Sequence, residues 1–266
     1  MAITTLDQAI AGMQPHRWFF KAVSPSIPSG RPISPWTLGG IPGAGGVLTS
    51  LAGSILSAPQ PGQLPFVNPS SGNSYLARFT GEAGIGGKYL LCDRLWHNGG
   101  FAAVTTPQTI NSPTWPARDI DGATAGKGVF LGLEYNATGA ANAPVITVSY
   151  NNSAGASGRV GVNAFATAAS SPQCSFYPIG LQAGDLGVQS VQTLTFSLVP
   201  TANSCNLVAY RVIASLEITG SYVGSSIDLV TGGMPQIWND SVLFPIFIPA
   251  QAAAVNLTGG YTVTQG

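Results

Sequence analysis

The chain has 266 residues, a formal net charge of zero and 8% charged residues, whereas soluble domains average about 25%. A phosphate backbone or an anionic membrane surface requires a basic excess on one face of a protein, so this composition excludes both as direct partners. Hydrophobic residues make up 45% of the chain, which predicts a folded protein with a sizeable core. So few charges are typical of an assembly component that buries its surface against neighbouring subunits.

The first predicted element is a short helix that begins after Thr5. Gln8 stands three residues after Thr5 and completes a capping box. A two-turn helix is unstable alone in water, so we expect its apolar face to dock on another surface. The densest aromatic cluster of the chain, at 18–20, follows it. Two interpretations of this cluster stay open, because aromatic residues anchor both subunit interfaces and a chain's own core. The candidate interface residues are Leu6, Ile10, Met13, Arg17, Trp18, Phe19 and Phe20.

Residues 24–74 are rich in proline, glycine and serine. Loops of this length are uncommon inside a compact domain, so residues 1–75 are predicted to form an extended arm, with the short helix at its start, that lies across other protein surface. The chain has no stretch of about 18 unbroken apolar residues, and we expect no membrane partner. The N-terminus lacks the basic region and apolar run of a signal peptide, which predicts synthesis in a cytoplasm.

Residues 76–266 show short runs of β-branched and aromatic residues at period two, separated by turn residues. This pattern is typical of an all-β fold, here an antiparallel β-sandwich of jelly-roll type that follows the extended arm. We therefore predict two parts, the arm at 1–75 and the sandwich domain at 76–266. The predicted strands are 76–79, 89–96, 129–135, 145–150, 160–162, 190–198, 207–213, 216–218, 243–248 and 261–263.

Catalytic and ligand-binding motifs fail on their spacing. A phosphate loop at Lys127 would need glycine where Asp121 stands, and the residues after Asp119 do not match a calcium loop. If 89–96 is a strand, Cys92 and the histidine at 97 point to opposite faces and cannot form a nucleophile and base pair. We predict no enzyme activity, no cofactor and no metal. The three cysteines lack a paired spacing, which predicts buried free thiols: Cys92, Cys174 and Cys205.

Several segments together resemble a family of structural proteins from the virions of tailed bacteriophages, and the similarity runs through nearly the whole chain. The family has no active site to carry over. The resemblance implies a virion component that is assembled in the cytoplasm of the bacterial host. The segments that carry it are Met1–Asp7, Gly72–Phe79, Leu91–Asn98 and Leu207–Val212.

Two function classes remain. In the first, the chain is a non-enzymatic capsid decoration or cement protein, a homotrimer that binds the major capsid protein or other virion proteins across capsid subunits. In the second, it is a tail, neck or fibre component with a carbohydrate-binding sandwich. Sugar sites combine exposed aromatics with carboxylates and amides, and the candidates are Trp115 and Trp238, although turn or core packing is the commoner role of tryptophan.

Overall fold

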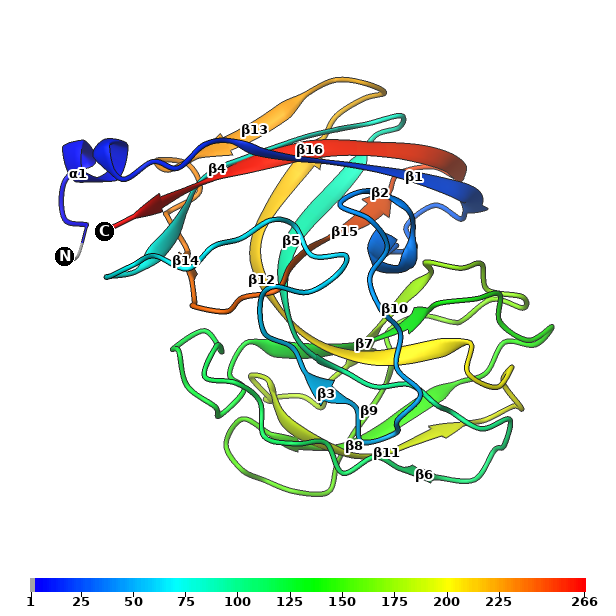
Figure 1. Ribbon diagram of the computed structural model, residues 1–266. Helices are drawn as coiled ribbons and strands as arrows, with labels where there is room; N and C mark the ends of the chain where they lie inside the picture. Colours follow the sequence, from blue (N-terminus) through cyan, green and yellow to red (C-terminus); the bar gives the residue numbers. More distant parts are fainter. Residues whose placement is uncertain (1–2) are drawn as a thin grey trace. The chain divides into compact units, whose positions relative to one another are not determined.

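The computed structural model describes residues 3–266 and is built almost wholly of antiparallel strands (Figure 1). One α-helix, α1 (Leu6–Ala11), and one 3-10 turn, η1 (Pro35–Thr37), accompany the strands. The strands are β1 (Arg17–Ile27), β2 (Gly40–Ile41), β3 (Ser54–Ile55), β4 (Ser74–Ala83), β5 (Gly87–His97), β6 (Gln108–Thr109), β7 (Val129–Tyr135), β8 (Ile146–Asn152), β9 (Arg159–Asn163), β10 (Phe176–Gly180), β11 (Val188–Phe196), β12 (Cys205–Ile218), β13 (Ser225–Asp228), β14 (Gln236–Ile237), β15 (Leu243–Pro249) and β16 (Ala253–Gln265).

The chain divides into two compact units, and the division differs from the predicted one. Unit 1 comprises the described residues up to 45, together with 57–93 and 212–266, and unit 2 comprises 46–56 and 94–211. The predicted boundary after residue 75 does not coincide with this division, because residues 17–27 of the predicted arm form β1 inside a sheet of unit 1. Met1 and Ala2 of the predicted arm lie outside the described residues.

Unit 1 is a two-layer sandwich. Its six-stranded sheet has the order β13-β4-β16-β1-β2, and β14 also pairs with β4. The second layer contains β15 and the part of β5 that pairs with it. Tyr89 of β5 fills the space between the layers, with its ring edge-on to Phe19 of β1 at 6.0 Å and to Phe79 of β4 at 6.2 Å. A Cβ atom on Gly81 would lie 2.9 Å from the Tyr89 ring, so close packing requires glycine there.

Unit 2 is a curled antiparallel sheet around one hydrophobic cluster. The order β12-β7-β10-β9-β8-β11-β6 runs through it. Burial alternates along β8, as expected for a strand with one face on a core. Trp96 and Trp115 pack in that core with ring centroids 5.3 Å apart. The predicted fold class, an all-β antiparallel sandwich with a short N-terminal helix, is therefore confirmed.

Unit 2 also buries an ion pair. Both guanidinium NH groups of Arg94 donate to the carboxylate of Glu134, at 3.1 and 2.7 Å, and both side chains are fully buried. Nη2 of Arg94 also lies 2.9 Å from Nδ1 of His97. Because burial and then the positive charge of Arg94 lower the pKa of His97 well below 6.5, His97 is neutral at neutral pH. A bidentate pair of this kind orients β5 against β7.

Candidate functional site

Helix α1 forms where the capping box predicts it. Oγ1 of Thr5 accepts from the amide of Gln8, and the Gln8 side chain accepts in return from the amide of Thr5. The helix is tied to the end of β16, where Oγ1 of Thr264 donates to the carbonyl of Ala9 at 2.6 Å and the amide of Gln265 donates to the carbonyl of residue 12. Figure 1 shows α1 beside the C-terminal end of β16. Ala9 is the buried residue of this helix.

Because α1 contacts β16 through Ala9 and its backbone, the larger apolar side chains of the helix stay exposed. Leu6 and Ile10, four residues apart on one face, are 56% and 54% exposed. Leu6 lines an apolar hollow of about 440 Å³ together with Val230, which is also exposed. We call Leu6, Ile10 and Val230 the N-terminal apolar surface. Residues 3–266 do not provide the surface on which the apolar face of this helix is expected to dock.

The aromatic cluster at 18–20 is split between the two faces of the six-stranded sheet. Phe19 is fully buried in the sandwich, whereas Trp18 is 54% exposed and Phe20 is 36% exposed on the outer face. Ile41 is the cross-strand partner of Phe20 and is exposed beside it. The core interpretation therefore holds for Phe19, which is not an interface residue, and the interface interpretation stays a prediction for Trp18 and Phe20. Of the other predicted interface residues, Met13 is exposed and Arg17, the partner of Tyr261, is half-buried.

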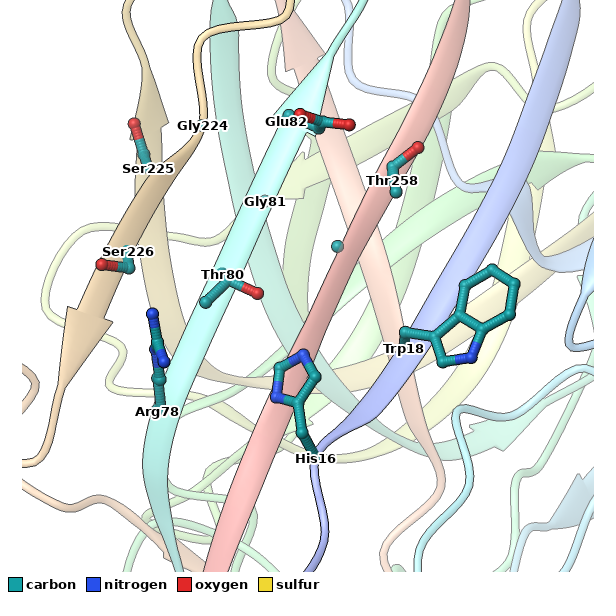
Figure 2. A pocket seen from close by; sticks show the side chains of 11 residues that line it. His16, Trp18, Arg78, Thr80, Gly81, Glu82, Gly224, Ser225, Ser226 and Thr258 are labelled. Carbon is teal, nitrogen blue, oxygen red and sulfur yellow. The ribbon is translucent and has the colours of Figure 1, made fainter.

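A second candidate site lies on the outer face of the same sheet (Figure 2). It is an open hollow of about 450 Å³ that extends over β1, β16, β4 and β13. Four residues from these strands are consecutive cross-strand partners, and three interstrand spacings make this row about 14 Å long. The row is Trp18, Gly260, Thr80 and Ser226. We call this site the sheet hollow. Its lining residues are His16, Trp18, Arg78, Thr80, Gly81, Glu82, Gly224, Ser225, Ser226, Thr258 and Gly259.

Glycine explains how the His16 imidazole fits into the sheet hollow. A Cβ atom on Gly260 would lie 2.3 Å from Nε2 of His16, so only glycine allows the imidazole to lie against β16. The imidazole is held there by a hydrogen bond of 3.1 Å between its Nδ1 and Oγ1 of Thr262. The strand position next to Trp18 therefore has no side chain of its own, and Figure 2 shows the Trp18 indole and the His16 imidazole on the same face.

Charges of opposite sign lie at the two ends of the sheet hollow. Arg78 and Glu82 are four residues apart on β4, about 13 Å at the rise of a strand, and both side chains are on the outer face. Neither takes part in an ion pair within residues 3–266. Between them, Oγ1 of Thr80 donates to the carbonyl of Gly260 at 3.2 Å. The sheet hollow thus offers donors and acceptors around one exposed aromatic ring.

The tryptophans proposed from the sequence as sugar platforms lie elsewhere. Trp115 is buried and its indole N–H donates to the carbonyl of Val188 at 2.7 Å, so it is a core residue. Trp238 is half-buried. The sequence predicts Trp18 as an interface or core residue and not as a sugar platform. The signal that sequence analysis missed is the pair of glycines at 259 and 260, which mark a strand position where another group approaches closely.

The structure also explains the rejected motifs. The carboxylate of Asp119 is buried and accepts four backbone N–H groups, at 2.8 to 3.2 Å, which closes the loop over 119–127. Across residues 3–266, no group of three or more His, Cys, Asp and Glu side chains is placed to hold a metal ion. The three cysteines are free and buried, as predicted, and burial raises the pKa of Cys174 and Cys205 to about 12. No described helix is long and apolar enough to cross a membrane.

No protein-family model and no curated protein matches the chain. Among solved structures, the VP2 subviral particle of infectious bursal disease virus is 9% identical with a TM-score of 0.19, over 96% of this chain and 82% of that chain. The family 11 carbohydrate-binding module of the cellulase Lic26A-Cel5E of Clostridium thermocellum is 11% identical with a TM-score of 0.20, over 62% of this chain and 94% of that chain. These TM-scores are too low for the likeness to carry an argument about fold or function.

Proposed function

We propose that this chain is a non-enzymatic structural protein of a bacteriophage virion, a capsid decoration or cement protein that binds across capsid subunits. The observation that carries the proposal is the N-terminal apolar surface. Leu6 and Ile10 are more than half exposed on a helix that the described residues, 3–266, order but do not cover. Because exposed apolar surface favours association, this surface is suited to contact with a further subunit. The resemblance of the sequence to virion proteins supplies the kind of partner.

The low charge of the whole chain supports the same proposal. An interface core is depleted in charged residues and enriched in aromatic ones, and the outer face of β1 presents Phe20 beside its exposed cross-strand partner Ile41. In the proposed assembly the chain is a homotrimer within the virion. The major capsid protein or another virion protein covers the N-terminal apolar surface. Assembly would take place in the cytoplasm of the bacterial host.

The test uses the double variant Leu6→Gln/Ile10→Gln, because glutamine removes the apolar surface and keeps a high helix propensity. The control is Val160→Thr/Val162→Thr, which makes two similarly exposed apolar residues of β9 polar. Each protein is added to phage particles that lack it, and the bound amount is measured on purified particles. The mass of each protein in solution is measured by sedimentation. The proposal requires that the wild-type and control proteins bind and that the helix variant loses occupancy. Equal occupancy of all three would refute it.

A second candidate function, a tail, neck or fibre component that contacts carbohydrate on the host surface, is favoured by a separate observation. The sheet hollow places an exposed indole among polar side chains. The location of the subunit discriminates between the two functions. A decoration protein would appear in many copies over the whole shell in an image of the particle, and a fibre component would appear in a few copies at one vertex.

A further inference from the structure

We infer that the sheet hollow is a binding site for a short neutral oligosaccharide. The starting point is the exposed indole of Trp18 in a hollow whose other lining residues are all polar or glycine. An open face of an antiparallel sheet normally carries polar side chains, and a 54% exposed tryptophan in the middle of one leaves a large apolar plane in water. Its neighbour across the strand pair is Gly260, over which the His16 imidazole lies, so the indole and the imidazole line the same part of the hollow.

The dimensions fit a small extended ligand. The row from Trp18 to Ser226 is about 14 Å long by strand spacing, and the hollow above it has a volume of about 450 Å³, within the usual range for small-molecule sites. Figure 2 shows the labelled side chains surrounding a bare strip of β16 and β4. A sugar ring stacked on the indole would extend from Trp18 across this strip toward Thr80 and Ser226.

The hydrogen-bonding groups favour a ligand rich in hydroxyls. A guanidinium only donates, a carboxylate only accepts, and the hydroxyls of Thr80, Thr258 and Ser226 can do both. A sugar hydroxyl both donates and accepts, so it can bond to every group in this set. The C–H face of a pyranose ring is apolar, which matches the flat indole of Trp18. The hollow therefore offers partners both for the hydroxyl groups of a sugar and for the apolar face of its ring.

The charges select against other ligands. Arg78 and Glu82 carry opposite charges at opposite ends of the hollow, so their net charge is zero. A nucleic acid or an anionic polysaccharide would need an excess of basic groups, and Glu82 would repel it. An apolar peptide would leave the charged and hydroxyl groups unpaired, at a cost in binding free energy. A neutral oligosaccharide avoids both penalties.

The experiment begins with an array of neutral and anionic oligosaccharides and continues with a titration of the strongest neutral binder. The fraction of tryptophan emission that acrylamide quenches is the readout. Trp36, Trp96 and Trp115 are buried and Trp18 is the most exposed of the five tryptophans, so bound sugar should protect Trp18 from the quencher. Trp18→Ala lacks this reporter, so the dissociation constants of the variants are measured by isothermal titration calorimetry. We expect Trp18→Ala to raise the dissociation constant at least about tenfold, which corresponds to about 1.4 kcal/mol.

The matched control is Phe20→Ala, which removes an exposed aromatic from the same strand and face but outside the hollow. It should change the dissociation constant by less than about twofold, and Glu82→Gln should weaken binding without moving the unfolding temperature. Failure to bind any neutral oligosaccharide, preference for anionic ones, or equal effects of Trp18→Ala and Phe20→Ala would overturn the inference. The inference would also be overturned if the protein binds no sugar and Trp18→Ala loses the trimer, because a second copy of the chain would then cover this face.

This inference is independent of the decoration function. Leu6 and Ile10 do not line the sheet hollow, so the variant Leu6→Gln/Ile10→Gln should bind sugar as the wild type does. Loss of particle occupancy with intact sugar binding would support the decoration proposal alone, whereas intact occupancy without any sugar binding would remove only the oligosaccharide site.

Discussion

Phe19 and Trp18 are adjacent residues of β1, and the structure predicts a large loss of stability for alanine at the first and a small one at the second. Phe19 has no exposed surface and its ring is edge-on to Tyr89 with centroids 6.0 Å apart. Removal of a buried phenylalanine side chain leaves a cavity and costs about 3 to 5 kcal/mol. At about 2 to 4 °C per kcal/mol for a chain of roughly this size, Phe19→Ala should lower the unfolding temperature by about 6 to 20 °C.

Trp18→Ala should cost far less. The indole is 54% exposed and its cross-strand neighbour is Gly260. Loss of its remaining contacts and of its strand propensity amounts to about 1 kcal/mol, or about 2 to 4 °C. The assay is thermal unfolding of the two variants and the wild type, followed by far-ultraviolet circular dichroism. Equal shifts, or a larger shift for Trp18→Ala, would refute the assignment of Phe19 to the core and Trp18 to the outer face. Deletion of residues 1–21 would remove half of β1 and should unfold unit 1.

Three further predictions concern buried ionisable side chains. Burial lowers the pKa of Lys21 to about 8, whereas an unfolded lysine keeps its proton to about pH 10.4. Between these values the unfolded chain binds more protons than the folded one. The free energy of unfolding should therefore rise from about pH 8 to about pH 9.5, by at most about 1.4 kcal/mol per pH unit. Lys21→Met should abolish this rise in urea unfolding curves, and an unchanged rise would contradict the assignment. The lowered pKa of His97 predicts a change on the acidic side of neutrality, because the unfolded histidine binds a proton below about pH 6.5 and the folded one does not. The free energy of unfolding should therefore fall from about pH 7 to about pH 5, and less steeply in His97→Gln. Parallel curves for His97→Gln and the wild type would exclude His97 as the cause. Glu134→Gln should lower the free energy of unfolding by about 3 to 5 kcal/mol, because it leaves the Arg94 guanidinium buried without its counter-charge. In chemical denaturation, the double variant Arg94→Met/Glu134→Leu should recover most of that loss. A double variant as unstable as the single one would argue against a charge effect.

Local features of the sequence predict local features of the structure. The capping box at Thr5 and Gln8 predicts α1 because both of its hydrogen bonds are made within four residues. The period-two runs predict β5, β7, β8 and β15 to within about three residues of their ends, because alternation reports a strand with one covered face. The unpaired spacing of the cysteines likewise predicts free thiols.

The sequence analysis did not predict β1, which it assigned to the arm. Prolines at 25, 28 and 32 interrupt the pattern, and the strand is completed by pairing with β16, a segment more than 200 residues away. No local pattern contains that partner. β10 was missed for a related reason, since it is short and contains Pro178. Because of this long-range pairing, residues 17–27 belong to the sandwich of unit 1 and not to the predicted arm.

The sheet hollow shows most clearly the division between sequence and tertiary structure. Alternation along 17–21 separates Trp18 and Phe20 from Phe19 and Lys21, but each set contains an aromatic residue, so the sequence by itself determines the two sets and leaves open which one faces the core. Packing against Tyr89 decides it, because the space beneath Gly259 accepts the Phe19 ring and the space beneath Gly81 accepts the Tyr89 ring. Lys21 is then buried with Phe19, and its ammonium donates to two backbone carbonyls. Trp18 is directed outward for the same physical reason: a strand has two faces, and only the tertiary contacts of its neighbours assign them.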